Sequence, residues 1–184
     1  SIKKSYWYSI ADQAVKFCQS KKDPQTLMLG LGSATIPNLI ASMNPKIHQT
    51  IVEIDENIIH ACKDYFGLEK LPNYTLIQAN AYKLLDQKDA FKHKFDAIIV
   101  DIFIGKPPYI CLESLEHSFT QKLLPHLKKE GMIIFNKPGN SAEAKSDTNS
   151  FANYLKTLFQ EVKVLEINDP RGYKNDELTA AKKK

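Results

Sequence analysis

Residues 27–40, LMLGLGSATIPNLI, pass from an apolar run through Gly30 and Gly32 into small residues and a proline. Glycine adopts positive φ and has no Cβ, so such a loop makes a tight turn or lets a ligand approach the backbone and the next helix. Pro37 suits the first turn of that helix, where its missing N–H costs nothing. This stretch alone supports both interpretations equally, and the rest of the chain has to decide between them.

Short apolar runs alternate with helical segments along the whole chain. We interpret as strands residues 27–31, 49–54, 74–78, 95–100, 132–135 and 162–167, and as helices residues 7–17, 37–43, 56–66, 81–85, 113–127 and 147–159. Parallel neighbours need a crossover, and the crossover covers the sheet. The alternation therefore predicts an α/β fold: a Rossmann-like, doubly wound, mostly parallel sheet with helices on both faces.

Polar residues follow the strands at the edge where such sheets bind ligands. Glu53 lies 23 residues after Gly30, and an acid near this separation accepts hydrogen bonds from both ribose hydroxyls. Together with the glycine loop, it favours ribose binding over a solvated acid. Asn80 follows the third strand, where it can bond a base edge or cap a helix. Asp101 follows the buried fourth strand and should face the same site.

Five segments together resemble the class I S-adenosylmethionine-dependent methyltransferase fold, and specifically its spermidine-synthase-like branch. They are LMLGLGSATIPNLI (27–40), IVEIDENIIHACKDYFGL (51–68), YTLIQANAYKLL (74–85), FDAIIVDIFIGKPP (95–108) and LLPHLKKEGMIIFN (123–136). The resemblance implies a seven-stranded sheet whose last strand, NDELTAA (175–181), is antiparallel to the rest. It also implies that S-adenosylmethionine, or its decarboxylated form, is the cofactor.

The resemblance implies a role for each residue after a strand. Gly30 and Gly32 match the loop beside the methionine part of the nucleotide, Glu53 the ribose-binding acid, and Asn80 the position that reads the adenine amine. Asp101 matches the first acid of the spermidine synthase motif D-S-x-D-P and is the expected catalytic residue. The cofactor-binding residues implied are Gly30, Gly32, Ser33, Glu53, Ile54, Asn80, Ala81 and Asp101. Asn136, after the fifth strand, is a further candidate for the pocket wall.

The departures from the family pattern direct the choice of reaction. Ile104 stands where the motif has its second acid, so it can neither hold a cationic amine nor take its proton. We therefore expect methyl transfer to an unidentified acceptor. The alternatives are aminopropyl transfer from decarboxylated S-adenosylmethionine to a diamine, and a non-catalytic nucleotide-binding or oligomerisation module. Nicotinamide dinucleotide binding is disfavoured, because Thr35 occupies the place of the third glycine of G-x-G-x-x-G.

Length and composition set the remaining expectations. The 184 residues carry a net charge of +4. Three of the positive charges belong to the lysines at 182–184, which we expect to form a solvated tail. Arg171 is the sole arginine, which disfavours nucleic acid as a partner. We expect one domain over residues 1–184, without the N-terminal β domain of spermidine synthases. No membrane span, signal peptide or metal-ligand spacing is evident, so we expect a cytoplasmic protein without a metal site. The family resemblance implies a small-molecule nucleotide as the ligand and a homodimer as a possible assembly.

Overall fold

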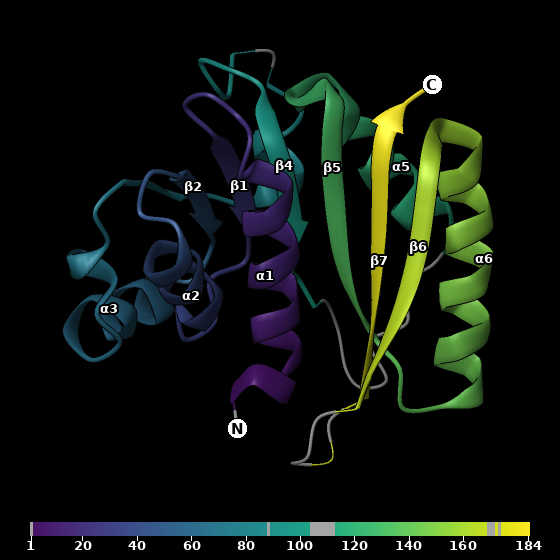
Figure 1. The fold of residues 1–184 in the computed structure, drawn as a ribbon, viewed down its shortest axis with the longest axis horizontal. Helices are drawn as coiled ribbons and strands as arrows, with labels where there is room; N and C mark the ends of the chain where they lie inside the picture. The colour runs from purple at the N-terminus through teal and green to yellow at the C-terminus, as the bar shows by residue number, and fades with distance from the viewer. Residues whose placement is uncertain (1, 88, 104–112, 169–171, 173) are drawn as a thin grey trace.

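A seven-stranded sheet forms the centre of the computed structural model, which describes residues 2–87, 89–103, 113–168, 172 and 174–184 (Figure 1). The strands lie in the order β3-β2-β1-β4-β5-β7-β6. Their bounds are β1 (Gln25–Leu29), β2 (His48–Glu53), β3 (Tyr74–Gln78), β4 (Phe95–Val100), β5 (Leu127–Pro138), β6 (Phe159–Asn168) and β7 (Lys174–Lys183). Strands β1 to β5 pair in parallel, whereas β7 is antiparallel to both β5 and β6. This confirms the expected mostly parallel sheet with an antiparallel last strand.

Helices cover both faces of the sheet, as the sequence predicts. One face carries α1 (Tyr6–Cys18), α2 (Thr35–Met43) and α3 (Glu56–Asp64), and the other carries α4 (Ala81–Leu84), α5 (Glu113–Leu123) and α6 (Ala142–Leu158). Short 3₁₀ turns lie at η1 (Ile2–Lys4), η2 (Leu68–Lys70) and η3 (Leu124–His126). None of the helices described here is long and apolar enough to cross a membrane.

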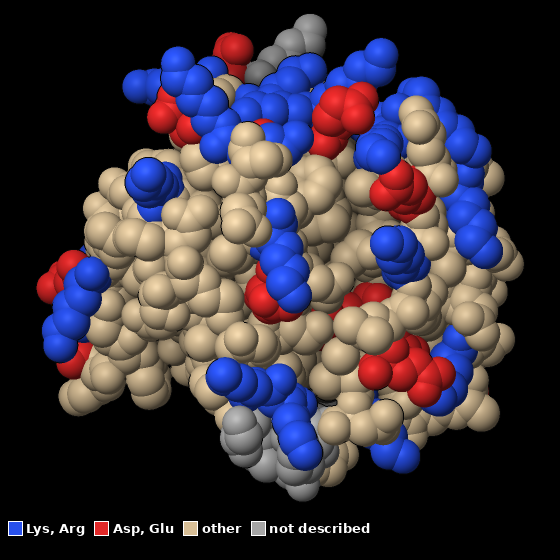
Figure 2. Space-filling model, viewed as in Figure 1, with Lys and Arg blue, Asp and Glu red and all other residues tan. Residues whose placement is uncertain are grey.

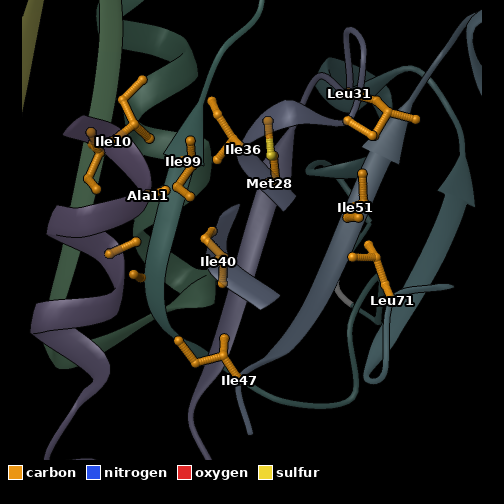
Figure 3. Close-up of a cluster of buried hydrophobic side chains, with 14 of the residues drawn as sticks. Ile10, Ala11, Met28, Leu31, Ile36, Ile40, Ile47, Ile51, Leu71 and Ile99 are labelled. Atoms are coloured by element: carbon orange, nitrogen blue, oxygen red, sulfur yellow. The ribbon is translucent and has the colours of Figure 1, made fainter. Parts of the chain in front are cut away.

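Two apolar clusters, one on each face, form the core. Successive strand residues point to opposite faces, so Met28 packs in the cluster under α1 and α2, while Leu27 and Leu29 pack in the cluster toward α5 and α6. Figure 3 shows part of the first cluster, in which Ile10 of α1 and Ile99 of β4 are packed together. This two-sided burial explains why the strands read as continuous apolar runs.

Helix starts are fixed by side chains that cap the first free N–H groups. Asp55 caps α3, accepting from the N–H of Asn57 at 2.8 Å, and Ser5 caps α1. The predicted helix over 147–159 begins earlier, because Ser141 accepts from the N–H of Ala144 at 3.0 Å and starts α6 at Ala142. The predicted helix over 113–127 ends at Leu123, where a 3₁₀ turn containing Pro125 follows.

The expected solvated tail at 182–184 is instead held to the fold: β7 includes Lys182 and Lys183, and Lys184 Nζ donates to the carbonyl oxygen of Lys156 at 2.6 Å. Strand β7 continues to Lys183, whose Nζ donates to the carbonyl oxygens of Leu124 at 3.0 Å and Leu127 at 2.8 Å. Lys182 pairs with Glu161 on β6. A lysine ammonium can donate to backbone carbonyl oxygens while the alkyl part of its side chain packs along the sheet. A run of basic residues therefore does not exclude a strand.

Candidate nucleotide-binding site

The loop after β1 is built around two glycines in left-handed conformations. Gly30 has φ +91°, and a Cβ there would lie 2.4 Å from the carbonyl oxygen of Asp101. Gly32 has φ +55° with no atom within 4 Å of an ideal Cβ, and its carbonyl accepts from the Cys62 thiol at 3.1 Å. Gly30 therefore lets the loops after β1 and β4 touch, and Gly32 leaves the backbone open on its outer side.

Glu53 ends β2 as a buried carboxylate, 8% exposed. Its Oε2 accepts from the N–H of Leu31 at 2.9 Å, and its Oε1 accepts from Ile54 at 2.7 Å and Asp55 at 2.9 Å. These three bonds tie the glycine loop to the start of α3. A carboxylate has about four acceptor positions, so one remains for a ligand hydroxyl beside the structural bonds.

The residues after β3 form the neighbouring wall. Asn80 caps α4, accepting from the N–H of Lys83 at 3.2 Å, which is the capping role weighed for it from the sequence. Asn80 and Ala81 also line the same cavity as Glu53. The side chain of Ile54, 60% exposed, adds an apolar surface beside them. Capping and ligand contact are thus compatible at Asn80.

Asp101 stands at the carboxyl end of β4, where its N–H donates to the carbonyl oxygen of Leu29 at 3.0 Å. Its Oδ1 accepts from Asn136 Nδ2 at 2.7 Å, and Asn136 Oδ1 in turn accepts from Asn175 Nδ2 at 2.9 Å. Burial raises the pKa of the Asp101 carboxyl, and the Asn136 hydrogen bond opposes part of that rise. Asn136 therefore holds the Asp101 carboxyl in position.

The strand ends enclose one cavity of about 460 Å³. The described residues that line it are Gly30, Leu31, Gly32, Val52, Glu53, Ile54, Ile58, Ala79, Asn80, Ala81, Tyr82, Asp101, Ile102 and Phe103. Seven of the eight cofactor-binding residues implied by the resemblance are among them, and Ser33 is the exception. The sequence therefore predicted which positions meet at this edge of the sheet.

A second cavity of about 240 Å³ shares Leu31, Gly32, Asp101 and Phe103 with the first. Ser33 lines this smaller cavity, together with Thr35 and with Tyr6 and Trp7 of α1. The position of these two aromatic residues at the cavity follows from how α1 packs on the sheet. Asp101 lies where the two cavities meet.

Both charged residues among those lining the two cavities, Glu53 and Asp101, are acidic. Figure 2 shows the densest group of basic side chains along its upper edge, the end at which Figure 1 places the C-terminus of β7. Because the parallel strands run opposite to β7, their carboxyl ends lie at the other edge of the sheet. The site therefore lies at the edge of the sheet opposite this basic group.

Glu177 on β7 is a buried carboxyl that the sequence analysis did not single out. It is 0% exposed, and its Oε2 accepts from Ser9 Oγ at 2.7 Å and from Gln13 Nε2. Burial raises its pKa to about 7, and the charge of Asp101 adds to the rise. No apolar pattern marks it in the sequence, because the predicted strand NDELTAA (175–181) is polar over its first three residues and Glu is rarely fully buried unless paired. Ile104 lies outside the described residues.

Comparison with known proteins agrees with this arrangement. The sequence model of the spermine/spermidine synthase domain family matches residues 18–175. The polyamine aminopropyltransferase of Vibrio vulnificus is 26% identical over 115 residues, which is 62% of this chain and 38% of that protein. The match thus spans well under half the length of that relative.

Solved structures share the fold at low sequence identity. Human methyltransferase-like protein 13 in complex with SAH has a TM-score of 0.70 and 21% identity, over 94% of this chain and 81% of that one. Spermidine synthase from Thermotoga maritima has a TM-score of 0.69 and 17% identity, over 94% of this chain and 58% of that one. With a family match over most of its length and this shared fold, the chain belongs to the spermine/spermidine synthase domain family.

Proposed function

We propose that this chain binds S-adenosylmethionine and transfers its methyl group to an acceptor. The observation that carries the proposal is the single cavity of about 460 Å³ to which the ends of β1 to β4 contribute a glycine loop, two carboxyls and an amide. Its volume falls within the range typical of small-molecule sites, and its apolar lining with few polar groups is also typical. When bound, S-adenosylmethionine supplies a methyl carbon activated by a positively charged sulfur.

Each residue has a role that follows from its position. Glu53 accepts a ribose hydroxyl at its remaining acceptor position, and Asn80 offers its amide to the adenine edge. Ile54 and Ala81 provide apolar contact for the base. The backbone at Gly32 leaves room for the tail of the nucleotide to pass toward Asp101 and the smaller cavity.

Asp101 is the group that we assign to the acceptor. Methyl transfer to a nucleophilic acceptor depends mainly on alignment and on exclusion of water. The bond from Asn136 fixes the Asp101 carboxyl where the two cavities meet. A raised pKa also makes a carboxylate a better proton acceptor near neutral pH, so Asp101 can orient the acceptor and take its proton.

Aminopropyl transfer from decarboxylated S-adenosylmethionine to a diamine is the second candidate. The family match and the acidic lining of both cavities favour it, because a diamine has to be bound as a cation. Ile104 at the place of the second motif acid weighs against it.

Calorimetric titration with S-adenosylmethionine, its decarboxylated form and methylthioadenosine tests these assignments. We expect binding of S-adenosylmethionine to weaken by at least about tenfold in Glu53→Ala, because a charged hydrogen bond of roughly 1.5–3 kcal/mol is lost. Glu56→Ala is the matched control, since Glu56 lies on the exposed first turn of α3 and should leave the affinity unchanged. Equal affinity in Glu53→Ala and the unmodified protein would remove the ribose assignment.

The same titrations separate the candidate functions. Preference for the decarboxylated nucleotide, together with turnover of putrescine, would replace methyl transfer by aminopropyl transfer. Failure of all three ligands to bind or to raise the melting temperature would instead favour a non-catalytic module.

A further inference from the structure

The last strand carries a buried carboxyl that the proposed reaction does not use. Glu177 is fully buried under α1, with Ser9 and Gln13 bound to its Oε2. Its Oε1 has no hydrogen-bond partner within the described part of the chain. A buried carboxylate with an unpaired oxygen is unfavourable, so this position stabilises the protonated form over the charged one.

Glu177 is connected to the candidate site through the sheet. It is the cross-strand partner of Asn136 on β5, and paired residues on neighbouring strands present their side chains to the same face. Asn136 donates to Asp101 at 2.7 Å and accepts from Asn175, which lies two residues before Glu177 and so on the same face. The two carboxyls therefore belong to one polar layer beneath α1.

The other charged groups near Glu177 are neutralised or displaced from it. On α1, Asp12 and Lys16 pair with each other at 2.7 Å. On β5, Lys137 extends to the opposite face, where carboxylates of α5 and α6 hold its Nζ. On β6, Leu165 is the residue paired with Glu177. Lys163 lies on the same face of the sheet but two residues away from Leu165.

On β7 itself, the neighbouring Asp176 points to the opposite face. Among the residues that the structure describes, Asp101 is the charged group that raises the pKa of Glu177 further. Two carboxyls in one buried layer disfavour double ionisation, so one proton is retained between them until the pH approaches neutrality. Burial raises the pKa of both carboxyls, that of Glu177 to about 7, so the retained proton belongs to the pair.

We propose that Glu177 releases its proton to solvent when the cationic sulfur of S-adenosylmethionine binds beside Asp101. This inference rests on the proposed function, because it needs the nucleotide in the larger cavity with its tail directed to the smaller one. A positive charge at the junction of the cavities stabilises both carboxylates, so the incoming cation replaces the proton and the site keeps its net charge. Through this proton release, Glu177 makes the site bind a ligand with a charged sulfonium in preference to one with a neutral thioether.

Calorimetric titrations in two buffers of different ionisation enthalpy, from pH 6 to pH 9, measure the protons released on binding. With S-adenosylmethionine we expect about half a proton per ligand at pH 7, more at pH 6, and less than about a tenth at pH 9, where Glu177 is already ionised. S-adenosylhomocysteine carries no charge on sulfur and should release markedly less at pH 6 and pH 7, and the two ligands should converge at pH 9.

Two variants locate the source of the proton. Glu177→Gln keeps an oxygen to accept from Ser9 and Gln13 but has no proton to lose, so it should abolish the difference between the two ligands. Glu161→Gln is the matched control: Glu161 is half-exposed, and its pKa is lowered by Lys182, so the difference should persist.

The outcomes are distinguishable. Equal proton release with both ligands in the unmodified protein overturns the inference whether or not the variant folds, and so does a difference that survives in Glu177→Gln. In both cases nucleotide binding itself stands. Absence of binding by either ligand would instead overturn the proposed function, and the inference with it.

Discussion

Gly30 lies where the loops after β1 and β4 touch, and its backbone conformation explains why a glycine is needed there. Its φ of +91° is a conformation that residues with a Cβ rarely adopt, and a Cβ would meet a backbone oxygen at 2.4 Å. The neighbouring glycine, Gly32, has positive φ but no such contact. The two glycines of the loop therefore have different reasons for their identity.

This difference predicts unequal costs of substitution. We expect Gly30→Ala to lower the free energy of unfolding by at least about 2 kcal/mol, since strained φ and a clash with backbone act together. Gly32→Ala should cost only about 1 kcal/mol, because strained φ acts alone. Urea unfolding of both variants measures the two values. Equal losses would show that the approach of Asp101 to Gly30 does not constrain the loop.

Among the elements, α6 shows how one polar side chain fixes a boundary. Ser141 accepts from the N–H of Ala144 at 3.0 Å, and Glu143 in the first turn suits the positive end of the helix dipole. The sequence contains both signals, yet the periodicity alone placed the start at Asp147. Capping residues therefore locate helix starts better than apolar spacing does.

Removing this cap should destabilise the protein measurably. We expect Ser141→Ala to reduce the free energy of unfolding by about 1 kcal/mol, which is typical for loss of an N-cap hydrogen bond. Ser150→Ala, at an exposed position inside the same helix, should change it by less than about 0.5 kcal/mol. Chemical denaturation of the two variants in parallel makes the comparison. A cost for Ser150→Ala as large as that for Ser141→Ala would refute the capping role.

At the scale of the whole molecule, the sequence predicted the features that depend on one strand and the residue after it. Apolar runs identified six of the seven strands, whereas the last came from the family resemblance. The strand ends identified Glu53, Asn80 and Asp101, because all parallel strands end at one edge. Glu177 was missed because its role depends on the pairing of β7 with β5 and on α1 lying above both. Neither contact has a local signature, since the partners are separated by 168 residues for Ser9.

The burial of Glu177 also predicts how global stability changes with pH. Its pKa is about 7 in the folded protein against an ordinary value of 4.5, so between these values the folded state binds more protons than the unfolded chain. Stability contributed by this group is therefore fully present below about pH 4.5, falls as the pH rises toward 7, and is lost above it. The full difference is on the order of 3 kcal/mol.

Glu177→Gln isolates this contribution from those of the other carboxyls. Asp101 and Asp176 also have raised pKa values and give slopes of the same sign, but both remain in the variant. We expect the unmodified protein to lose stability relative to Glu177→Gln between pH 5 and pH 8, as measured by urea unfolding at intervals across that range. Parallel pH profiles for the two proteins would mean that Glu177 is ionised in the folded state throughout, and that α1 packs over a carboxylate whose charge is balanced within the fold.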